Sequence, residues 1–302
     1  MAALRFRTSS EFNNYARAFR LGGMETEVPC LDIAVFGSTQ ILNALDFRLF
    51  PEVNAENFAF EVQSFLYDGL LLRRFAGNIR KGGKVIFGVA PFNFLLWDLS
   101  PSMLDSYRFR RYYFMCGPDF HPNCSESECR RIVGNFRFRQ LLHRLVRMKY
   151  RGRLDALRDD GKVLTPEMLE KDAGKKAADF RNNFFLAPDF RSAKDEAAVE
   201  KNIAKLCENI GFAQSSGLDP VILIAPNAPE LLRLVDPEIL DRFLWRPLEI
   251  VRQKSGIEIL NFMEDPQFSG CENFRDALSL SKTGRTKFTS RLIKQIESRK
   301  IC

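Results

Sequence analysis

The stretch Asp32-Ile33-Ala34-Val35-Phe36-Gly37-Ser38-Thr39 decides the fold of this chain. Its apolar residues run directly into a glycine, and a segment of helical character follows at 40–45. A continuous apolar run that ends at a glycine is typical of a strand buried on both faces of a parallel sheet. Ser38 would then stand at the carboxyl edge of that sheet, where α/β proteins bind ligands and place nucleophiles. The alternative is that Ser38 or Thr39 only caps the helix that follows.

Four more segments have the character of strands, and helical segments separate them. They are a short strand within 51–60, a buried strand at 84–90 and two further strands at 220–226 and 257–262. The segment 63–75 has helical spacing, and we expect 78–83 to be a loop after it, because two glycines stand at its end. Strands that alternate with crossover helices predict parallel pairing.

The pattern predicts an α/β protein, namely a three-layer α/β/α, flavodoxin-like parallel five-stranded sheet with a helical insertion. In the common strand order 2-1-3-4-5 the first and third strands are neighbours. Ser38 and Asn93 follow these two strands and would therefore flank one crevice. The expected domains are an N-terminal lead-in at 1–30, an α/β domain at 31–97 and 216–302, and a mostly helical, basic insertion at 98–215.

The composition indicates an ordinary globular protein of 302 residues, with 45% hydrophobic and 27% charged residues. The first residues lack the apolar central region of a secretory signal. The longest apolar stretch, 85–97, is interrupted by Pro91 and Asn93 and is too short to span a bilayer. Seven cysteines, an odd number, do not suggest a secreted disulfide scaffold. We therefore expect a cytoplasmic protein without a transmembrane segment.

The positive charge is concentrated in the region 104–153, where twelve Arg or Lys residues stand against four Asp or Glu. Arginines alternate there with aromatic residues. One interpretation is an element with a buried aromatic face and a solvated arginine face. A second is a site for an anionic ligand or surface, such as a glycan or a carrier. We favour both over the third interpretation, a nucleic-acid site.

Cys116, His121, Cys124 and Cys129 form the one array with the residue types of a metal site. Four such ligands can hold a structural zinc ion tetrahedrally. The spacing matches no zinc module, so chance clustering or a disulfide is the alternative, and no metal is predicted. The chain also lacks a P-loop, a Gly-x-Gly-x-x-Gly loop and a His-Glu-x-x-His motif. We therefore expect no cofactor.

Several short motifs occur in a fixed order along the chain. They are Gly37-Ser38-Thr39, Asn57-Phe58-Ala59, Gln63-Ser64, Pro91, Ala225-Pro226, Asp265, Phe274-Arg275-Asp276 and Gly284-Arg285-Thr286. This order resembles the SGNH/GDSL hydrolase superfamily, especially its divergent branch in surface-polysaccharide biosynthesis. The resemblance covers roughly 31–97 and 219–292 and leaves the insertion unmatched.

The resemblance implies that Ser38 is a nucleophile that attacks an acyl carbon. It also implies that Asp276 is the acid of the family's Asp-x-x-His motif and that Asn93 is an oxyanion donor. Ser279 stands where that motif has its general-base histidine, and Val62 stands where the family has a glycine. A serine cannot accept a proton at neutral pH as an imidazole does, so the catalytic dyad is incomplete.

The two histidines of the chain, His121 and His143, both lie in the insertion, and either is a candidate replacement base. The resemblance therefore predicts a carbohydrate esterase or O-acyltransferase in surface-polysaccharide biosynthesis, with a carbohydrate or acyl-ester substrate. The alternative is a catalytically inactive binding or scaffold protein of the same fold that recognises an anionic glycan or carrier.

Overall fold

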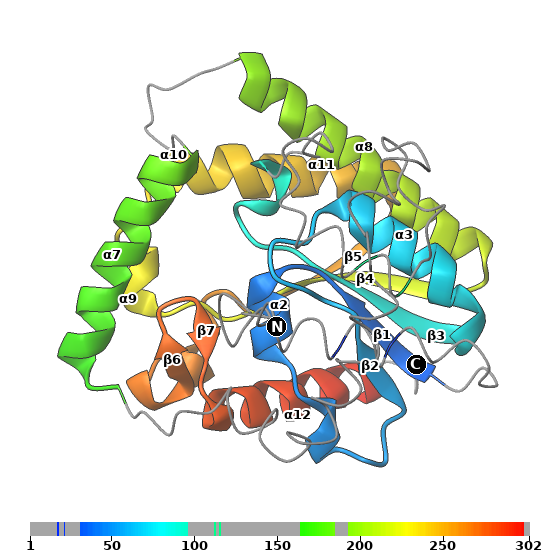
Figure 1. Cartoon of the computed structure of the whole chain (residues 1–302), viewed down its shortest axis with the longest axis horizontal. Helices are drawn as coiled ribbons and strands as arrows, with labels where there is room; N and C mark the ends of the chain where they lie inside the picture. Colours follow the sequence, from blue (N-terminus) through cyan, green and yellow to red (C-terminus); the bar gives the residue numbers. More distant parts are fainter. Residues whose placement is uncertain are drawn as a thin grey trace, which may run out of the picture. The chain divides into compact units, whose positions relative to one another are not determined.

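The computed structural model of the chain describes most of the predicted α/β domain (Figure 1). The described residues are 31–95, 164–184 and 193–298, with the single helical positions Arg17, Leu21, Tyr112 and Met115. The fold divides into two compact units, one made of 29–97 and 162–302 and the other of 1–28 and 98–161. In the second unit Leu21, Tyr112 and Met115 are buried. All that follows concerns the first unit.

Several sequence-based predictions fall outside the described residues. They are the basic region 104–153, the array Cys116, His121, Cys124 and Cys129, and the candidate base His143. Within the described ranges, no helix has the length and apolar character needed to cross a membrane.

The central sheet has five parallel strands in the order β2-β1-β3-β4-β5. The strands are β1 (Leu31–Phe36), β2 (Ala55–Asn57), β3 (Ile79–Gly88), β4 (Asp219–Ile224) and β5 (Glu258–Asn261). This arrangement confirms the predicted α/β class and the 2-1-3-4-5 order. Because β1 lies between β2 and β3, its apolar side chains are buried on both faces.

The third strand begins earlier than predicted. β3 starts at Ile79, so the expected loop at 78–83 is wrong. Gly82 has φ +71°, and the pairing with β1 shifts register there, so the glycines form an irregularity within the strand. The backbone N–H of Gly82 also donates to the carbonyl of Gly217, which ties this irregularity to the start of β4.

Helices cover both faces of the sheet (Figure 1). On one face α8 (Ala193–Ser215) packs against α3 (Phe65–Phe75), α11 (Arg246–Ser255) and β4. On the other face α2 (Thr39–Ala44) packs against α12 (Lys282–Ser298). These contacts give the three layers.

Further short elements lie around the carboxyl edge. α7 (Pro166–Phe184) packs against α9 (Pro229–Leu232), and α10 (Pro237–Leu240) continues through a π-helical turn at Asp241–Trp245 into α11. Both α7 and α8 lie within the range 98–215 expected for the insertion, and both belong to the unit that contains the sheet.

Three phenylalanine rings stack in a row that begins at the end of β1. The rings of Phe36 and Phe58 stack with centroids 5.2 Å apart, and those of Phe58 and Phe75 with centroids 4.8 Å apart. All three rings are fully buried. Aromatic pairs of this kind contribute about 0.5–1.5 kcal/mol each beyond the burial of their area, so they stabilise the end of β1 directly before the turn at Gly37.

At that turn two glycines let β1, β3 and α2 approach closely. Gly37 has φ +146°, and a Cβ atom on it would lie 2.9 Å from the carbonyl oxygen of Gly88. A Cβ on Gly88 would clash with the side chain of Ile41 in α2. Neither position has room for a side chain.

We predict that Gly88→Ala lowers the free energy of unfolding by about 1–3 kcal/mol, because the added methyl group overpacks the contact with Ile41. Urea denaturation of the full chain measures this difference. Gly174→Ala in α7 is the matched control, since no atom lies within 4 Å of its added Cβ. The control should gain up to about 1 kcal/mol. Equal stability of the Gly88→Ala variant and the wild type would contradict the close approach.

Candidate functional site

Ser38 lies at the carboxyl edge of β1, in the N-cap position of α2. Its backbone is extended, and its side chain makes no capping hydrogen bond. The residue is only 1% exposed, and its Oγ has no hydrogen-bond partner among the described residues. Thr39 is the first residue of the helix rather than its cap, and its hydroxyl accepts a hydrogen bond from the N–H of Val62 at 3.2 Å. Ser38 therefore presents a buried hydroxyl group that the local structure leaves unused.

Asn93 follows the neighbouring strand β3 and begins the 3₁₀ turn η4 (Asn93–Leu95). It is 1% exposed. Its Oδ1 accepts a hydrogen bond of 2.6 Å from the N–H of Ala90, whereas its Nδ2 has no partner among the described residues. Since β1 and β3 are adjacent and parallel, Ser38 and Asn93 follow neighbouring strands at the same edge of the sheet. Each of these two residues thus has a buried polar atom without a partner among the described residues, and both follow strands that are neighbours at this edge.

Val62, which precedes α3, has a strained backbone conformation. It is the one described residue other than glycine with a positive φ, +52°. A β-branched residue rarely adopts this left-handed conformation, which costs on the order of 1–3 kcal/mol. The hydrogen bond from its N–H to Thr39 holds the residue there. Val62 occupies the position at which the motif comparison expects a glycine.

Asp68 is a site residue that the sequence reasoning missed. It lies in α3, is fully buried, and accepts a hydrogen bond of 2.6 Å from Nε2 of Gln63. Burial raises the pKa of Asp68 to about 7, although hydrogen bonds from Gln63 and from the backbone N–H of Gly37 partly offset this effect. The sequence does contain a signal, because Asp68 stands one helical turn from both Phe65 and Leu72 on the apolar face of α3.

Asp276 and Ser279 lie opposite each other in a small antiparallel hairpin of β6 (Phe274–Asp276) and β7 (Ser279–Leu280). Directly opposed residues of such a pair have their side chains on one face, with Cβ atoms roughly 5 Å apart. Oδ1 of Asp276 accepts a hydrogen bond of 3.0 Å from the N–H of Leu278, and Ser279 is buried. The structure therefore brings together the two residues at the Asp-x-x-His positions.

Two hydrogen bonds to the backbone of Ala277 attach this hairpin to α7 and to the start of α9. The N–H of Ala277 donates to Oδ2 of Asp172 in α7 at 2.9 Å, and its carbonyl accepts from the N–H of Ala228 at 3.3 Å. β7 also packs against α2, the helix that starts directly after Ser38. Within the described part of the chain, however, no hydrogen bond joins Ser38 to Asn93, Asp276 or Ser279.

The described residues include neither of the two histidines of the chain, so they supply no imidazole to this edge. They also contain no group of three or more His, Cys, Asp or Glu side chains that is arranged to hold a metal ion. Asp68 is the carboxyl group that a hydrogen bond links to this edge, through the backbone N–H of Gly37 next to Ser38.

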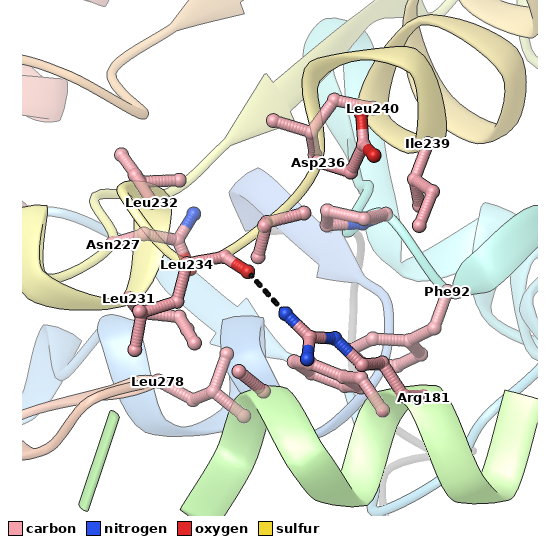
Figure 2. A pocket seen from close by; sticks show the side chains of 14 residues that line it. Phe92, Arg181, Asn227, Leu231, Leu232, Leu234, Asp236, Ile239, Leu240 and Leu278 are labelled. Atoms are coloured by element: carbon pink, nitrogen blue, oxygen red, sulfur yellow. Dashed lines mark hydrogen bonds between the residues drawn. The ribbon is translucent and has the colours of Figure 1, made fainter. Parts of the chain in front are cut away.

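An apolar pocket opens beside the same edge (Figure 2). Its described walls come from the turn after β3, from α7, from the segment 227–240 and from the tip of the β6–β7 hairpin. About 600 Å³ of empty space lies between these walls, including the part open to solvent. The rings of Phe92 and Phe180 stack at one side with centroids 5.9 Å apart. Arg181 donates a hydrogen bond of 3.3 Å to the carbonyl of Leu234 across the opening.

Gln40 connects the pocket to the turn at Ser38. It lies two residues after Ser38 in α2 and is 3% exposed. Its Nε2 donates a hydrogen bond of 2.7 Å to Oδ1 of Asn227, which lines the pocket. Its Oε1 has no partner among the described residues. One hydrogen bond thus links the helix that follows Ser38 to the wall of the pocket.

No protein-family model matches this chain, and a search of curated proteins also finds no match. The resemblance to the SGNH/GDSL superfamily therefore stays a prediction based on short motifs. The roles of Ser38, Asn93, Asp276 and Ser279 are therefore argued from their positions and contacts in the structure.

We predict that Asp68 makes the stability of the fold depend on pH. Between its usual pKa near 4 and its raised pKa near 7, the folded state keeps a proton that the unfolded state releases, so the free energy of unfolding falls as pH rises. The largest loss is about 4 kcal/mol. In Asp68→Asn this contribution is absent, and the Oδ1 acceptor is retained. The stability of the variant relative to wild type should therefore increase from pH 4 to pH 7 and stay level above pH 8.

Urea denaturation at several pH values tests this expectation. Glu297→Gln on the exposed side of α12 removes one carboxyl group without touching the site and is the control. A difference between Asp68→Asn and wild type that does not change with pH would show that Asp68 is ionised in the folded protein at all of these pH values.

Proposed function

We propose that this protein is a serine-dependent carbohydrate esterase or O-acyltransferase, whose acyl-ester substrate binds at the carboxyl edge of the sheet. Ser38 is the nucleophile, and the side-chain amide of Asn93 is a donor to the carbonyl oxygen. The carbohydrate as the alcohol half of the ester, and surface-polysaccharide biosynthesis as the setting, rest on the resemblance to the SGNH/GDSL superfamily alone.

The observation that carries the proposal is the pair of unused polar atoms, Oγ of Ser38 and Nδ2 of Asn93. A buried polar atom without a partner costs about 1–3 kcal/mol, and most buried polar groups in native proteins are paired. An ester satisfies both atoms at once, because it offers an electrophilic carbon to the hydroxyl and an oxygen to the amide. The strained Val62, which is bonded to the hydroxyl of Thr39 next to Ser38, adds support, since strain of this kind concentrates at functional sites.

The chemistry follows from these groups. Oγ of Ser38 bonds to the acyl carbon, and negative charge develops on the carbonyl oxygen. The side-chain N–H of Asn93 stabilises this charge. The ester C–O bond then breaks, and the sugar alcohol leaves with the proton of the serine hydroxyl. Water takes the acyl group from Ser38 in an esterase, and a second sugar hydroxyl takes it in an acyltransferase.

A second candidate function is binding without turnover, with an anionic glycan or carrier as the ligand. It is favoured by Ser279, which lies opposite Asp276 at the position where a general base would stand. A serine hydroxyl there cannot remove the proton of Ser38 at neutral pH. Retention of the carboxylate without its base is the pattern expected of a protein that has lost the reaction and kept the site.

Labelling with a fluorophosphonate distinguishes the two candidates. We predict that the reagent labels the full-length wild-type protein, and that Ser38→Ala abolishes the labelling. Ser215→Ala, which removes an exposed serine hydroxyl at the end of α8, is the matched control and should be labelled as the wild type is. Labelling that persists in Ser38→Ala would exclude Ser38 as the nucleophile. A wild-type protein that takes no label contradicts the esterase proposal and favours binding.

We also predict that Ser279→His raises the hydrolysis rate of p-nitrophenyl acetate. The new imidazole would stand opposite Asp276, which would orient it as a base toward α2 and Ser38. General-base assistance typically contributes about 10²- to 10⁴-fold, and an incomplete geometry should give the lower part of that range. Initial rates of the single variant and of the double variant Ser279→His with Ser38→Ala measure the effect.

The double variant separates catalysis at Ser38 from simple hydrolysis by an accessible imidazole. If Ser38 is the nucleophile, the gain disappears in the double variant. Equal rates for the single and double variants would mean that the β6–β7 hairpin does not direct residue 279 toward Ser38, and the alignment of the C-terminal motif would then be wrong.

A further inference from the structure

We propose that the pocket beside the sheet edge binds the hydrocarbon chain of the acyl group, so that the substrate carries an aliphatic acyl chain of several carbons rather than an acetyl group. This inference rests on the proposed function and names its substrate class. It is carried by the walls of the pocket, by its charges and by its connection to Ser38 and Asn93.

The walls are suited to a flexible hydrocarbon. Leu231 and Ile239 are buried and face the pocket from α9 and α10, while Leu278 faces it from the hairpin tip (Figure 2). The stacked rings of Phe92 and Phe180 form a flat apolar surface beside them. Burial of each methylene group of a ligand against such walls should raise affinity about fourfold.

The charged groups of the described lining are already engaged. Arg181 is exposed and donates to the carbonyl of Leu234. Asp236 accepts a hydrogen bond of 2.9 Å from the N–H of Glu238 as the cap of α10. The interior of the pocket is therefore left to apolar side chains, which an uncharged chain matches and a sugar ring with its hydroxyl groups does not.

Two connections lead from the pocket to the ester site. Pro91 and Phe92 line the pocket, and the next residue is Asn93. On the other side, Gln40 is bonded to Asn227 in the wall and lies two residues after Ser38. A chain that occupies the pocket can therefore have its carbonyl group near Ser38 and Asn93.

Gln40 supplies an independent sign of a ligand. Its Oε1 is buried and has no hydrogen-bond partner among the described residues, although the other end of the same amide is bonded to Asn227. An unused acceptor at this point suits an O–H or N–H group of a substrate. We assign it to the polar end of the substrate, next to the ester, with the hydrocarbon chain beyond it.

Calorimetric titration of the full-length protein with sodium acetate, hexanoate and decanoate tests the inference without requiring turnover. The affinity should rise with chain length, by at least tenfold from hexanoate to decanoate, and acetate should not bind measurably. Leu278→Trp and Leu232→Trp both fill the pocket and should weaken decanoate binding at least tenfold. Ile250→Trp changes an exposed apolar residue of α11 outside the pocket and should have no effect.

Equal affinities for hexanoate and decanoate would overturn the inference, and so would decanoate binding that neither filling variant weakens in folded protein. Fluorophosphonate labelling keeps this result separate from the proposed function. Labelling of Ser38 without binding of decanoate leaves the esterase and removes the acyl-chain pocket. Decanoate that binds in the pocket of a protein whose Ser38 takes no label removes the esterase and with it the acyl-ester assignment. Decanoate that both binds and slows the labelling of Ser38 supports the pocket and its connection to the ester site.

Discussion

The close approach of Gly37 and Gly88 is the constraint on which the rest of the site depends. At this point the ends of β1 and β3 and the first turn of α2 come so near one another that no side chain fits on either glycine. This close packing follows directly on β1, and Ser38, the next residue after Gly37, is buried. A looser contact would let α2 move away from β3. The position of Ser38, at the start of α2, would then no longer be fixed relative to Asn93, which follows β3.

The polar atoms that lack partners are informative because of where they lie. Ser38, Gln40, Asp68 and Asn93 each contain a buried side-chain atom without a hydrogen bond among the described residues. All four belong to the segments that follow or flank the ends of β1 and β3. Most buried polar groups in proteins are paired, so each unpaired one carries an energetic cost. Among the described residues Oε2 of Glu230 in α9 is also buried without a partner, but the other four lie around the edge where parallel sheets bind ligands.

The sequence predicted the sheet well, because buried parallel strands are apolar along their whole length. β1 and β4 were recognisable for that reason, and the predicted strand order is the common one for doubly wound folds. β5 is different, because its end residues Glu258 and Asn261 are polar and exposed. The start of β3 was not predicted, since Arg80, Lys81 and Gly82 are polar or flexible residues that lie within the register shift between β1 and β3.

The candidate site was only partly predictable. Ser38 and Asn93 could be named because each follows an apolar strand, whereas Asp68 was hidden within an apolar helix. The pocket could not be foreseen either, because its walls come from segments far apart in the sequence that become neighbours only in the fold. Asp276 and Ser279 were named from a motif. The hairpin that pairs them was not predicted, because strands of three and two residues are too short to show an alternating pattern in the sequence.

The hydrogen bond between Gln40 and Asn227 spans 187 residues of the chain. At ordinary rates of protein synthesis, roughly 10 to 40 s separate the emergence of these two residues from the ribosome. During that interval the nascent chain already contains the turn with Ser38, but neither β4, which pairs with β3, nor the wall that Asn227 provides. The apolar ends of β1 and β3 remain uncovered until the second half of the sheet is made, so assembly of the candidate site is a late event in folding and requires a long loop to close.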